Sequence, residues 1–454
     1  MACEWHSAPL GELISYIGKG VAPKYINDGP DATMVLGQKC VRNQALQYEQ
    51  ARFHNSAEKA VNPDKEVRKG DILVNATGVG SAGRVAQVMA DPSRQCITDG
   101  HVITLRAKDI NPFYLGYFVK SKQNTIELMA EGSTGQTEMN RQRLQNEIIV
   151  TFPESKDLQK RIAEYGLAID KKIAVNNQLN DYLLEVGEMR FADLETRGTL
   201  SKTVHIADLP HILETGKRPK GGAASCGIPS VGAENVKKLG EFNYSSNKYI
   251  PRTFADNLKK GRVNGYELII YKDGGRPGQF IPHFSMFGEG YPYKEFYINE
   301  HVFKLDFGDR GLNEFAYYYF HTPYVMKWLE TNGTKAAIPG INRQNIEELE
   351  FPDPEQESVQ DFCKRIQPYF TAIFRNCLEN KQLQSLRDTL LPRLMSGEID
   401  VSKVDLTQLT NNHLSGCGSF CSVCCPSGLA SEFHEWFREH FFFGYGHLCK
   451  ADLG

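Results

Sequence analysis

Two stretches of the sequence share the same spacing of apolar positions, which alternates between three and four residues. The first runs from Leu158 to Arg190 and the second from Val359 to Leu390. This spacing places one seam along an α-helix and is typical of helices that pack lengthwise against another helix. The seam positions are Ile162, Tyr165, Ile169, Lys172, Asn176, Leu179, Leu183 and Val186 in the first stretch, and Ile366, Tyr369, Ile373, Asn376, Asn380, Leu383, Arg387 and Leu390 in the second.

The two predicted helices match position by position, because every seam residue of the second follows its counterpart by 204 positions. Asn176 therefore corresponds to Asn380, and a buried amide pair at matched seam positions fixes the register of two helices at some cost in stability. Lys172 and Arg387 also stand on the seam, so the packing cannot be uniform there. We predict that these helices, each of about 30 residues and roughly 45 Å long, are partners.

The segments that precede the two helices are also similar, so the chain is a tandem repeat. Each begins with a related pattern, in which Leu13, Ile17, Gly20 and Pro23 recur as Leu209, Leu213, Gly216 and Pro219. Each then has a short strand followed by a glycine-rich turn, in KGDILVNATGVGSAGR and GYELIIYKDGGRPG. The matched pairs that follow are His101 and His301, the triplets Asn140-Arg141-Gln142 and Asn342-Arg343-Gln344, and Phe152-Pro153 and Phe351-Pro352.

We therefore predict an α+β chain in which two tandem strand-rich heads are separated and joined by two long antiparallel coiled-coil helices, with an internal pseudo-two-fold repeat. The predicted segments are a first head at 1–153, a central helix at 154–195, a second head at 196–354, a C-terminal helix at 355–400 and a cysteine-rich tail at 401–454. Two-fold protein symmetry suits a bipartite DNA site with a fixed separation of its halves.

Composition narrows the class of protein. The 454 residues are 41% hydrophobic, which is ample for ordinary buried cores. We expect a cytoplasmic protein without a membrane partner, because the N-terminus lacks a secretory pattern and no window approaches the ~20 apolar residues of a membrane span. Six of the eleven cysteines are scattered singly, as is usual for reduced thiols. The net charge of −3 gives no hint of a polyanionic partner, so any basic face must be local.

The alternation of heads and helices, the KGDIL strand at Lys69–Leu73, the passage from Asn-Arg-Gln to Phe-Pro and the ending LLPRLMSGEID at Leu390–Asp400 resemble the specificity subunit of type I restriction-modification systems. The resemblance implies two target recognition domains, each reading one half of a bipartite double-stranded DNA target. It implies helices that set the spacing and dock modification (methyltransferase) subunits, with restriction subunits joining through the complex. It also implies a non-catalytic chain without cofactors, because S-adenosylmethionine, ATP and magnesium belong to the partner subunits.

Candidate DNA-binding residues follow from residue type and predicted loop position, since base edges are read by Arg, Lys, Asn and Gln side chains. The candidates in the first head are Gln38, Lys39, Arg42, Asn43, Gln44, Ser133, Thr134 and Gln136. The candidates in the second head are Lys217, Arg218, Lys220, Lys237, Lys238, Arg276, Asn332, Thr334 and Lys335. The second head has ten Lys or Arg residues between Gly216 and Arg262 against three acidic residues, which indicates a local basic face. The ordinary alternative for each candidate is an exposed polar loop residue.

An enzymatic alternative remains open at two places. Gly78–Gly83 fits the G-x-G-x-x-G pattern of dinucleotide or S-adenosylmethionine sites, although a glycine-rich hairpin turn is favoured because the next segment is short and broken by Pro92. The cluster Cys417–Cys425 could hold a metal ion, but no second tight ligand pair follows it, and a disordered or non-native tail is favoured over zinc. We predict no metal and no catalytic residue. A third alternative is an orphan structural subunit from a degraded locus.

Overall fold

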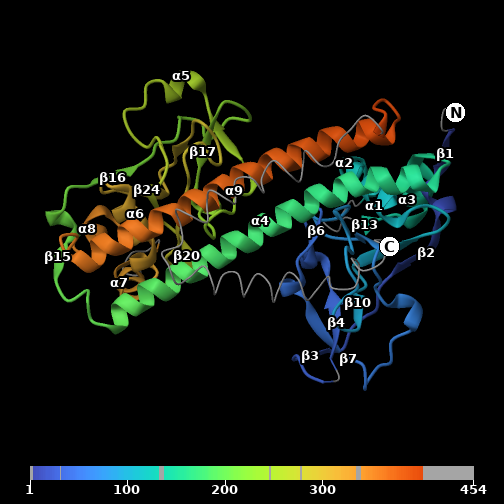
Figure 1. Ribbon diagram of the computed structural model, residues 1–454, viewed down its shortest axis with the longest axis horizontal. Coiled ribbons are helices and arrows are strands. Elements are labelled where there is room, and N and C mark those ends of the chain that lie inside the picture. Colours follow the sequence, from blue (N-terminus) through green and yellow to red (C-terminus); the bar gives the residue numbers. More distant parts are fainter. Residues whose placement is uncertain are drawn as a thin grey trace, which may run out of the picture. The chain divides into compact units, whose positions relative to one another are not determined.

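The computed structural model describes residues 4–30, 32–131, 138–244, 247–276, 279–333 and 339–401. Among these residues the chain forms two compact units, which are described one at a time. The first unit contains the residues up to Lys171 together with those from Gln384 onward, and the second runs from Lys172 to Leu383. Each unit therefore holds one strand-rich head and a part of each long helix, α4 (Lys156–Thr196) and α9 (Glu357–Met395) (Figure 1).

The head of the first unit is built on two four-stranded sheets and a strand pair. The first sheet is antiparallel in the order β2-β11-β8-β9, formed by Ile14–Lys19, Val102–Ala107, Ile72–Asn75 and Val85–Gln87. The second sheet has the order β10-β4-β7-β3, formed by Cys96–Thr98, Ala32–Leu36, Arg52–Asn55 and Tyr25–Ile26, and β10 is parallel to β4. The strand pair joins β1 (Trp5–Pro9) to β14 (Ile149–Pro153).

The head of the second unit repeats this topology with one strand fewer in its second sheet. Its antiparallel sheet has the order β16-β24-β19-β22, formed by Ile212–Thr215, Val302–Asp306, Leu268–Tyr271 and Phe284–Met286. Its second sheet has the order β18-β17-β23, formed by Lys248–Ile250, Ile228–Val231 and Tyr297–Ile298, and here β17 and β23 are parallel. Its strand pair joins β15 (Thr203–His205) to β25 (Glu350–Pro352). The recurrence of a parallel pair within a largely antiparallel head shows that both heads are copies of one fold.

Shorter elements complete the two heads. The first head also contains the strand pairs β5–β6 (Val41–Arg42 and Ala45–Leu46) and β12–β13 (Ala130–Glu131 and Glu138–Met139), and the helices α1 (Pro112–Ser121), α2 (Gln123–Leu128) and α3 (Arg141–Glu147). The second contains the strand pair β20–β21 (Gly275–Arg276 and Gln279–Phe280) and the helices α5 (Arg252–Ala255), α6 (Arg310–Phe320), α7 (Pro323–Gly333) and α8 (Arg343–Glu347).

Local sequence explains where these elements begin. β8 reads Ile-Leu-Val-Asn and is buried on both faces, as expected of a strand in the middle of a covered sheet. α1 begins after Asn111, whose side chain accepts hydrogen bonds from the backbone N–H groups of Phe113 and Tyr114, each at 3.0 Å. The two Asn-Arg-Gln triplets also begin helices, because Asn140 caps α3 and Asn342 caps α8. Their recurrence in the sequence therefore has a structural cause.

Within the second unit, α4 and α9 run antiparallel and are joined by amides. The Asn176 side chain donates to the Asn380 side chain at 2.8 Å, and the Asn376 side chain donates to the Asn180 side chain at 2.8 Å. Moving four residues forward along α4, from Asn176 to Asn180, moves the partner four residues back along α9, from Asn380 to Asn376. This is the pattern of antiparallel helices. The Lys172 ammonium lies 3.4 Å from the Glu379 carboxylate, so this seam lysine has an acidic partner across the pair.

Within the first unit, the two helices are joined by charge. The Arg387 guanidinium on α9 lies 2.7 Å from the Asp170 carboxylate on α4. The same carboxylate accepts a 2.7 Å hydrogen bond from the Tyr117 hydroxyl of α1 and lies 3.5 Å from the Lys120 ammonium. One carboxylate therefore connects the first head to both long helices.

The predicted seam residues are all at least partly buried. Ile162, Tyr165, Ile169, Asn176, Ile366, Ile373 and Asn380 are buried, and Leu179, Leu183, Val186, Tyr369, Leu383 and Leu390 are half-buried. Beyond Asn176 the fully buried row of α4 passes instead through Asn180, Leu184, Gly187 and Phe191. Phe191 packs on Phe315 of α6 with ring centroids 5.3 Å apart. The buried face of this part of α4 is therefore turned toward its head as well as toward α9.

The architecture confirms the predicted α+β class, with two strand-rich heads and two long helices that pack together. The apolar core of the second unit extends from the head into both helices, since α4 contributes Leu184 and α9 contributes Phe370 and Phe374. The core of the first unit likewise joins Leu105 of its sheet to Ile162 of α4 and Leu394 of α9. The helix segments are thus part of each unit's core.

Candidate nucleic-acid interface

In the first head, three loops and the start of strand β13 meet around Thr77, which follows strand β8. The Gln38 side chain donates a 2.6 Å hydrogen bond to the Thr77 carbonyl. The Thr77 hydroxyl lies 2.9 Å from Nδ1 of His101, and the residue forms an isolated β-bridge with Glu138. Glu138 is also ion-paired with Lys19. The β8–β9 turn, the turn before β11, the loop after β4 and the start of β13 therefore lie side by side.

The structure divides the predicted residues of the first head into two groups. Gln38 belongs to the cluster around Thr77, and the adjacent Lys39 is exposed. Arg42 and Asn43 are exposed at the turn between β5 and β6. Gln44, in that same turn, donates a 3.2 Å hydrogen bond to the Lys120 carbonyl. Ser133, Thr134 and Gln136 fall between β12 and β13, outside the described residues.

The second head places corresponding residues at the corresponding loops. Asp273 follows strand β19 as Thr77 follows β8, and it forms an isolated β-bridge with Gly340. Nδ1 of His301 lies 3.1 Å from the Asp273 carboxylate, and Nε2 lies 3.3 Å from the Glu300 carboxylate. Glu300 is in turn paired with Arg218 at 2.9 Å. The predicted residue Arg218 is therefore joined through two side chains to the same cluster.

The other predicted residues of the second head are distributed among several loops. Lys217, Lys220 and Lys237 are exposed, and Lys238 is paired with Asp181 of α4 at 2.6 Å. Asn332 lies near the end of α7 and donates a 3.0 Å hydrogen bond to the Trp328 carbonyl. The backbone of Arg276 is in β20, whereas its side chain and residues Thr334 and Lys335 lie outside the described part of the chain.

The matched histidines His101 and His301 stand at the centre of the two clusters. The backbone N–H of His101 donates to the Asp99 side chain, and that of His301 donates to the Asn299 side chain, both at 2.9 Å. The same tight turn thus presents an imidazole at the loop edge of each head. Their matched positions in the repeat were the available signal, whereas Thr77 and Asp273 gave none because they differ in type.

Two matched glycines hold these turns in place. A Cβ atom on Gly20 would lie 1.9 Å from the Thr98 carbonyl oxygen, and one on Gly216 would lie 1.6 Å from that of Ile298. Both distances are far below van der Waals contact, and carbonyls within sheet ends cannot move freely. The strand ends at Thr98 and Ile298 lead into the histidine turns. They can lie this close to positions 20 and 216 only because glycine has no side chain.

We expect Gly216→Ala to lower the free energy of unfolding by about 3 kcal/mol, because the backbone must shift to relieve the clash. Gly20→Ala should act similarly in the first head. Gly29→Ala is the matched control, since a Cβ there meets nothing within 4 Å, and it should change stability by less than about 0.5 kcal/mol. Urea denaturation of the three variants measures this, and equal effects at Gly29 and Gly216 would contradict the steric explanation.

The enzymatic alternative at Gly78–Gly83 is not supported by the backbone. These residues connect β8 to its antiparallel neighbour β9, with left-handed φ angles at Gly78, Gly80 and Gly83. A dinucleotide fingerprint must instead open a helix toward a parallel strand. The loop is thus the predicted glycine-rich hairpin turn, and Cys417–Cys425 lies outside the described residues.

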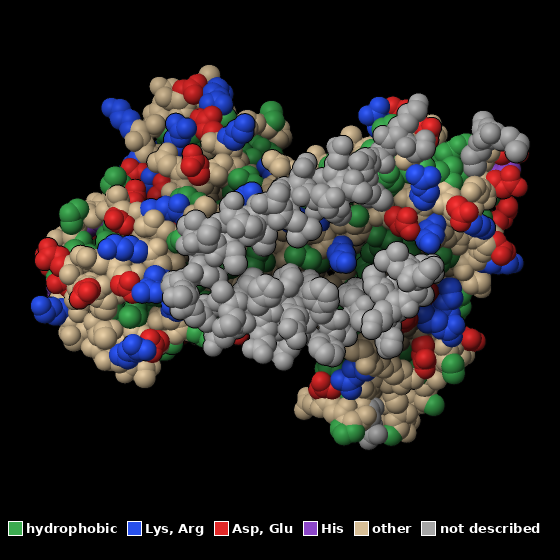
Figure 2. All heavy atoms as spheres, viewed as in Figure 1, with side chains coloured by type: hydrophobic (Ala, Val, Ile, Leu, Met, Phe, Trp, Pro, Cys, Tyr) green, Lys and Arg blue, Asp and Glu red, His purple; other side chains and the backbone are tan. Residues whose placement is uncertain are grey.

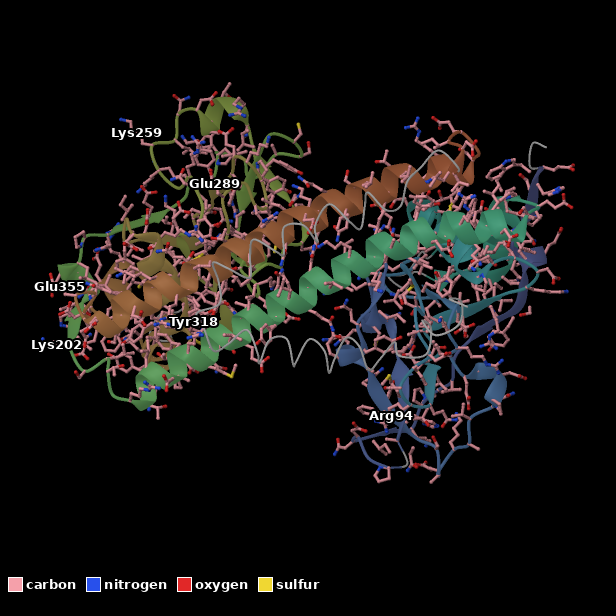
Figure 3. The ribbon with its side chains drawn as sticks, viewed as in Figure 1. Arg94, Lys202, Lys259, Glu289, Tyr318 and Glu355 are labelled. Carbon is pink, nitrogen blue, oxygen red and sulfur yellow. The ribbon has the colours of Figure 1, made fainter. Side chains whose placement is uncertain are left out.

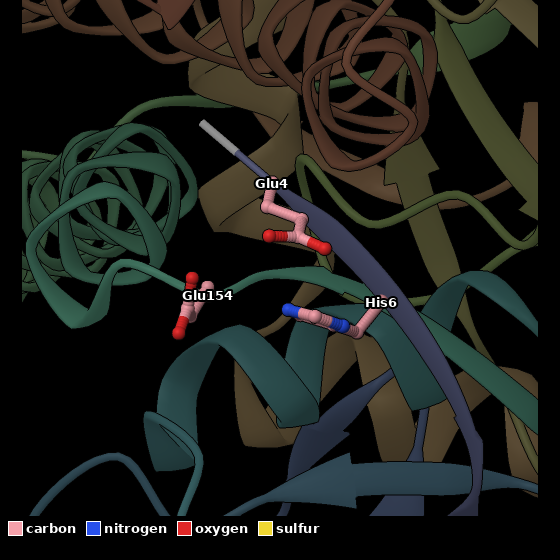
Figure 4. Close-up of side chains that lie close together, drawn as sticks. All are labelled: Glu4, His6 and Glu154. Atoms are coloured by element: carbon pink, nitrogen blue, oxygen red, sulfur yellow. The ribbon is translucent and has the colours of Figure 1, made fainter. Parts of the chain in front are cut away.

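One group of potential metal ligands occurs among the described residues, at the junction of the first head with α4. Ligand atoms of Glu4, His6 and Glu154 lie within 4.8 Å of one another (Figure 4). Glu4 and Glu154 are exposed, and exposed acidic groups often gather without binding an ion. We therefore assign no metal there. The described helices also include none that is both long and apolar enough to cross a membrane.

Comparisons with known proteins agree with the resemblance described from the sequence. The family model described as "Type I restriction modification DNA specificity domain" matches residues 4–185, which include the first head and most of α4. The Type I restriction enzyme HindI specificity subunit of Haemophilus influenzae is 31% identical over 108 residues. That alignment covers 23% of this chain and 23% of the relative, so the match spans less than a quarter of the relative's length.

Solved structures of similar organisation are more distant. The type I restriction-modification S subunit from M. genitalium is 16% identical, with a TM-score of 0.48 over 87% of this chain and 96% of that one. The HsdS subunit from Thermoanaerobacter tengcongensis is 12% identical, with a TM-score of 0.32 over 87% and 97% of the two chains. Because both TM-scores are low, the assignment rests on the sequence matches. The predicted resemblance is thereby confirmed for the matched part of the chain, because residues 4–185 are similar to type I restriction-modification DNA specificity domains.

Proposed function

We propose that this chain selects the DNA target of a type I restriction-modification complex, with each head reading one half of a bipartite double-stranded sequence. The observation that carries the proposal is the duplication of the loop cluster. Thr77 with His101 and Asp273 with His301 occupy the same place in two copies of one fold, within a family defined by a DNA specificity domain. Two equivalent readers on one chain suit a target with two halves.

The readout residues in this proposal are chosen by residue type and by their place in the loops of each head. Gln38 and Lys39 would serve the first half-site, and Lys220 and Arg276 the second, because amide and guanidinium groups form bidentate contacts with bases. The two exposed residues Arg42 and Asn43 would contact the flanking DNA. Exposed lysines such as Lys217 and Lys237 would contact phosphates, which position the protein without reading sequence.

Chemistry would belong to the partner subunits. In this proposal α4 and α9 set the separation of the half-sites and dock the modification subunits, and the restriction subunits join through the complex. S-adenosylmethionine, ATP and magnesium would be held by those partners, and the complex would act on DNA in the cytoplasm. A chain that transferred a methyl group to DNA by itself would contradict this division of labour.

Co-expression with a candidate modification subunit, followed by mapping of methylated bases in the host genome, tests the proposal. We expect one split motif with a constant gap. Gln38→Ala with Lys39→Ala should relax only one half of the motif, and Lys220→Ala with Arg276→Ala only the other, so each variant is the control for its counterpart. A contiguous motif, or changes in both halves from one double variant, would contradict the assignment of one half-site to each head.

A further inference from the structure

Two separate stretches of the second head come together at a pair of glycines. A Cβ atom on Gly261 would lie 3.1 Å from the Cα of Gly216, so the two backbones are nearly in contact. The Gly261 N–H donates to the Glu214 carboxylate at 2.8 Å, and the Gly261 carbonyl accepts from the Ile298 N–H at 2.8 Å. This junction brings the chain after β16 next to the chain that precedes β19.

The junction is flanked on both sides by exposed basic residues. We call these residues the junction patch: Lys217, Lys259, Lys260 and Arg262. Across the described part of the chain, no ion pair involves any of them. Figure 3 labels Lys259, which projects near α5. Figure 2 shows several Lys and Arg side chains on the surface of the second head around α5. The acidic neighbour Glu214 is engaged by Lys304 at 3.4 Å and by the Gly261 N–H, so it does not neutralise the patch.

Other cations of the same basic stretch are neutralised within the protein. Lys248 pairs with Glu234, and Arg252 lies 2.8 Å from Glu295. The basic stretch therefore contains two kinds of cation. Some form ion pairs within the head, and those of the junction patch are free to contact a ligand. A cluster of available cations on a folded surface creates a local positive potential, even in a chain whose net charge is −3.

Among the described residues of the first head, the cations next to the matched glycine Gly20 are engaged within the protein. Lys19 stands beside Gly20 but is ion-paired with Glu138. Lys65 approaches the same glycine and donates a 3.0 Å hydrogen bond to the Gly20 carbonyl. Both cations at this position are thus used for internal contacts. The two copies of the fold therefore differ in the number of unpaired cations beside the matched glycine.

We propose that the junction patch binds phosphates of the DNA backbone and contributes salt-dependent affinity to the complex. This inference rests on the proposed function. Phosphate neutralisation releases condensed counterions, and each contact contributes about 0.9 to the slope of log K against log salt concentration. Such contacts hold DNA without choosing its sequence.

The test uses the full chain assembled with its modification subunits and measures binding to a duplex that carries the methylated motif, from 50 to 200 mM salt. Lys260→Gln with Arg262→Gln should make the slope about 2 less steep. Binding to an unrelated duplex should weaken by the same factor, and the half-sites should not change. Adding Lys217→Gln and Lys259→Gln should reduce the slope by about 2 more.

The matched control is Lys248→Gln with Arg252→Gln, which removes the same charge from the same head at residues already paired. Its slope should stay close to that of the wild type. Lys260→Arg with Arg262→Lys keeps the charge and should also keep the slope, which separates electrostatics from a change in fold. An unchanged slope in the Lys260 and Arg262 variant would overturn the inference. A wild-type complex that failed to prefer the motif duplex would instead overturn the proposed function.

Discussion

Replacing Asp170 by Asn is expected to lower the free energy of unfolding by about 3–5 kcal/mol, which is the usual cost of removing one partner from a buried charge cluster. The Asp170 carboxylate faces the Lys120 ammonium at 3.5 Å and the Arg387 guanidinium at 2.7 Å. The side chains of Lys120 and Arg387 are only 4% and 14% exposed. Asn would preserve the shape of the side chain but leave two buried cations together.

The titration behaviour of the cluster agrees with this expectation. Burial alone would raise the pKa of Asp170, but the charges of Lys120 and Arg387, with hydrogen bonds from Tyr117 and Arg387, hold that pKa below its ordinary value. Burial lowers the pKa of Lys120, although Asp170 opposes this shift. A carboxyl with a lowered folded-state pKa stabilises the protein above its unfolded-state pKa, and this contribution is lost as the pH falls. Asp170→Asn should therefore also reduce acid sensitivity.

The control for Asp170→Asn is Asp361→Asn, which makes the same chemical change in α9. Asp361 lies 2.7 Å from Arg365, but both side chains are about half exposed, so this change should cost less than about 1 kcal/mol. Urea denaturation compares the two. A combined Asp170→Asn and Lys120→Met variant should recover part of the loss, because it removes one of the unpaired cations. Equal costs for Asp170→Asn and Asp361→Asn would show that the cluster is no more than a surface ion pair.

The order of elements could be predicted because the chain is a tandem repeat, so that each half could be compared with the other. Gly20 and Gly216 match in the sequence, and each lies where a Cβ would strike a strand-end carbonyl. Asn140 and Asn342 match, and each caps a helix before the strand that leads to a long helix. The helix caps are local and the glycine contacts are not, but both recur, so their residue types are constrained in both copies. The predicted partnership of the long helices likewise followed from matched periods.

Contacts between distant segments could not be predicted in the same way. Lys238 was identified as a candidate DNA-binding residue, but its partner Asp181 stands 57 residues earlier on α4. The basic stretch therefore appeared uniform in the sequence, whereas the fold divides it into paired and available cations. The hydrogen bond of Gln44 to Lys120 similarly separates it from Gln38, although the two are close in sequence.

The buried face of α4 shows a related limit. A seam of period three and four describes a helix with one long partner, and it fits as far as Asn176. Beyond this point the helix is buried by two neighbours. A Cβ atom on Gly187 would lie 2.0 Å from the Tyr318 hydroxyl of α6, which requires a residue without a side chain there. Because α6 also packs against this part of α4, the fully buried side chain is Leu184, one position after the predicted seam residue Leu183.

The amide network between the long helices leads to the second large prediction. Asn176 donates to the side chains of Asn380 and Glu379, both at 2.8 Å, and Asn380 donates to Asn177 at 2.8 Å. Asn176 and Asn380 are only 2% and 8% exposed. A buried amide that loses its partner keeps its desolvation penalty of about 1–3 kcal/mol, whereas replacing both partners by apolar groups can be nearly neutral.

We therefore expect Asn176→Leu and Asn380→Leu to lower the free energy of unfolding by about 2 kcal/mol each, and the double variant to be about as stable as the wild type. The double-mutant cycle should give a coupling energy of about 3–4 kcal/mol, near or above the upper end for neighbouring residues. Gln178→Leu, at an exposed position of the same helix turn, is the control and should change stability by less than about 0.5 kcal/mol.

The outcome of this cycle distinguishes two roles for the network. If the double variant is as destabilised as the sum of the single variants, the amides contribute stability independently and do not act as a pair. If stability is recovered, the role of the amides is to specify the register of the two helices. A polar residue on a helix seam fixes register at a cost in stability. In the proposed function the register of α4 against α9 contributes to the separation of the half-sites. The stable double variant should then methylate its motif with a less uniform gap, which the same genome mapping measures.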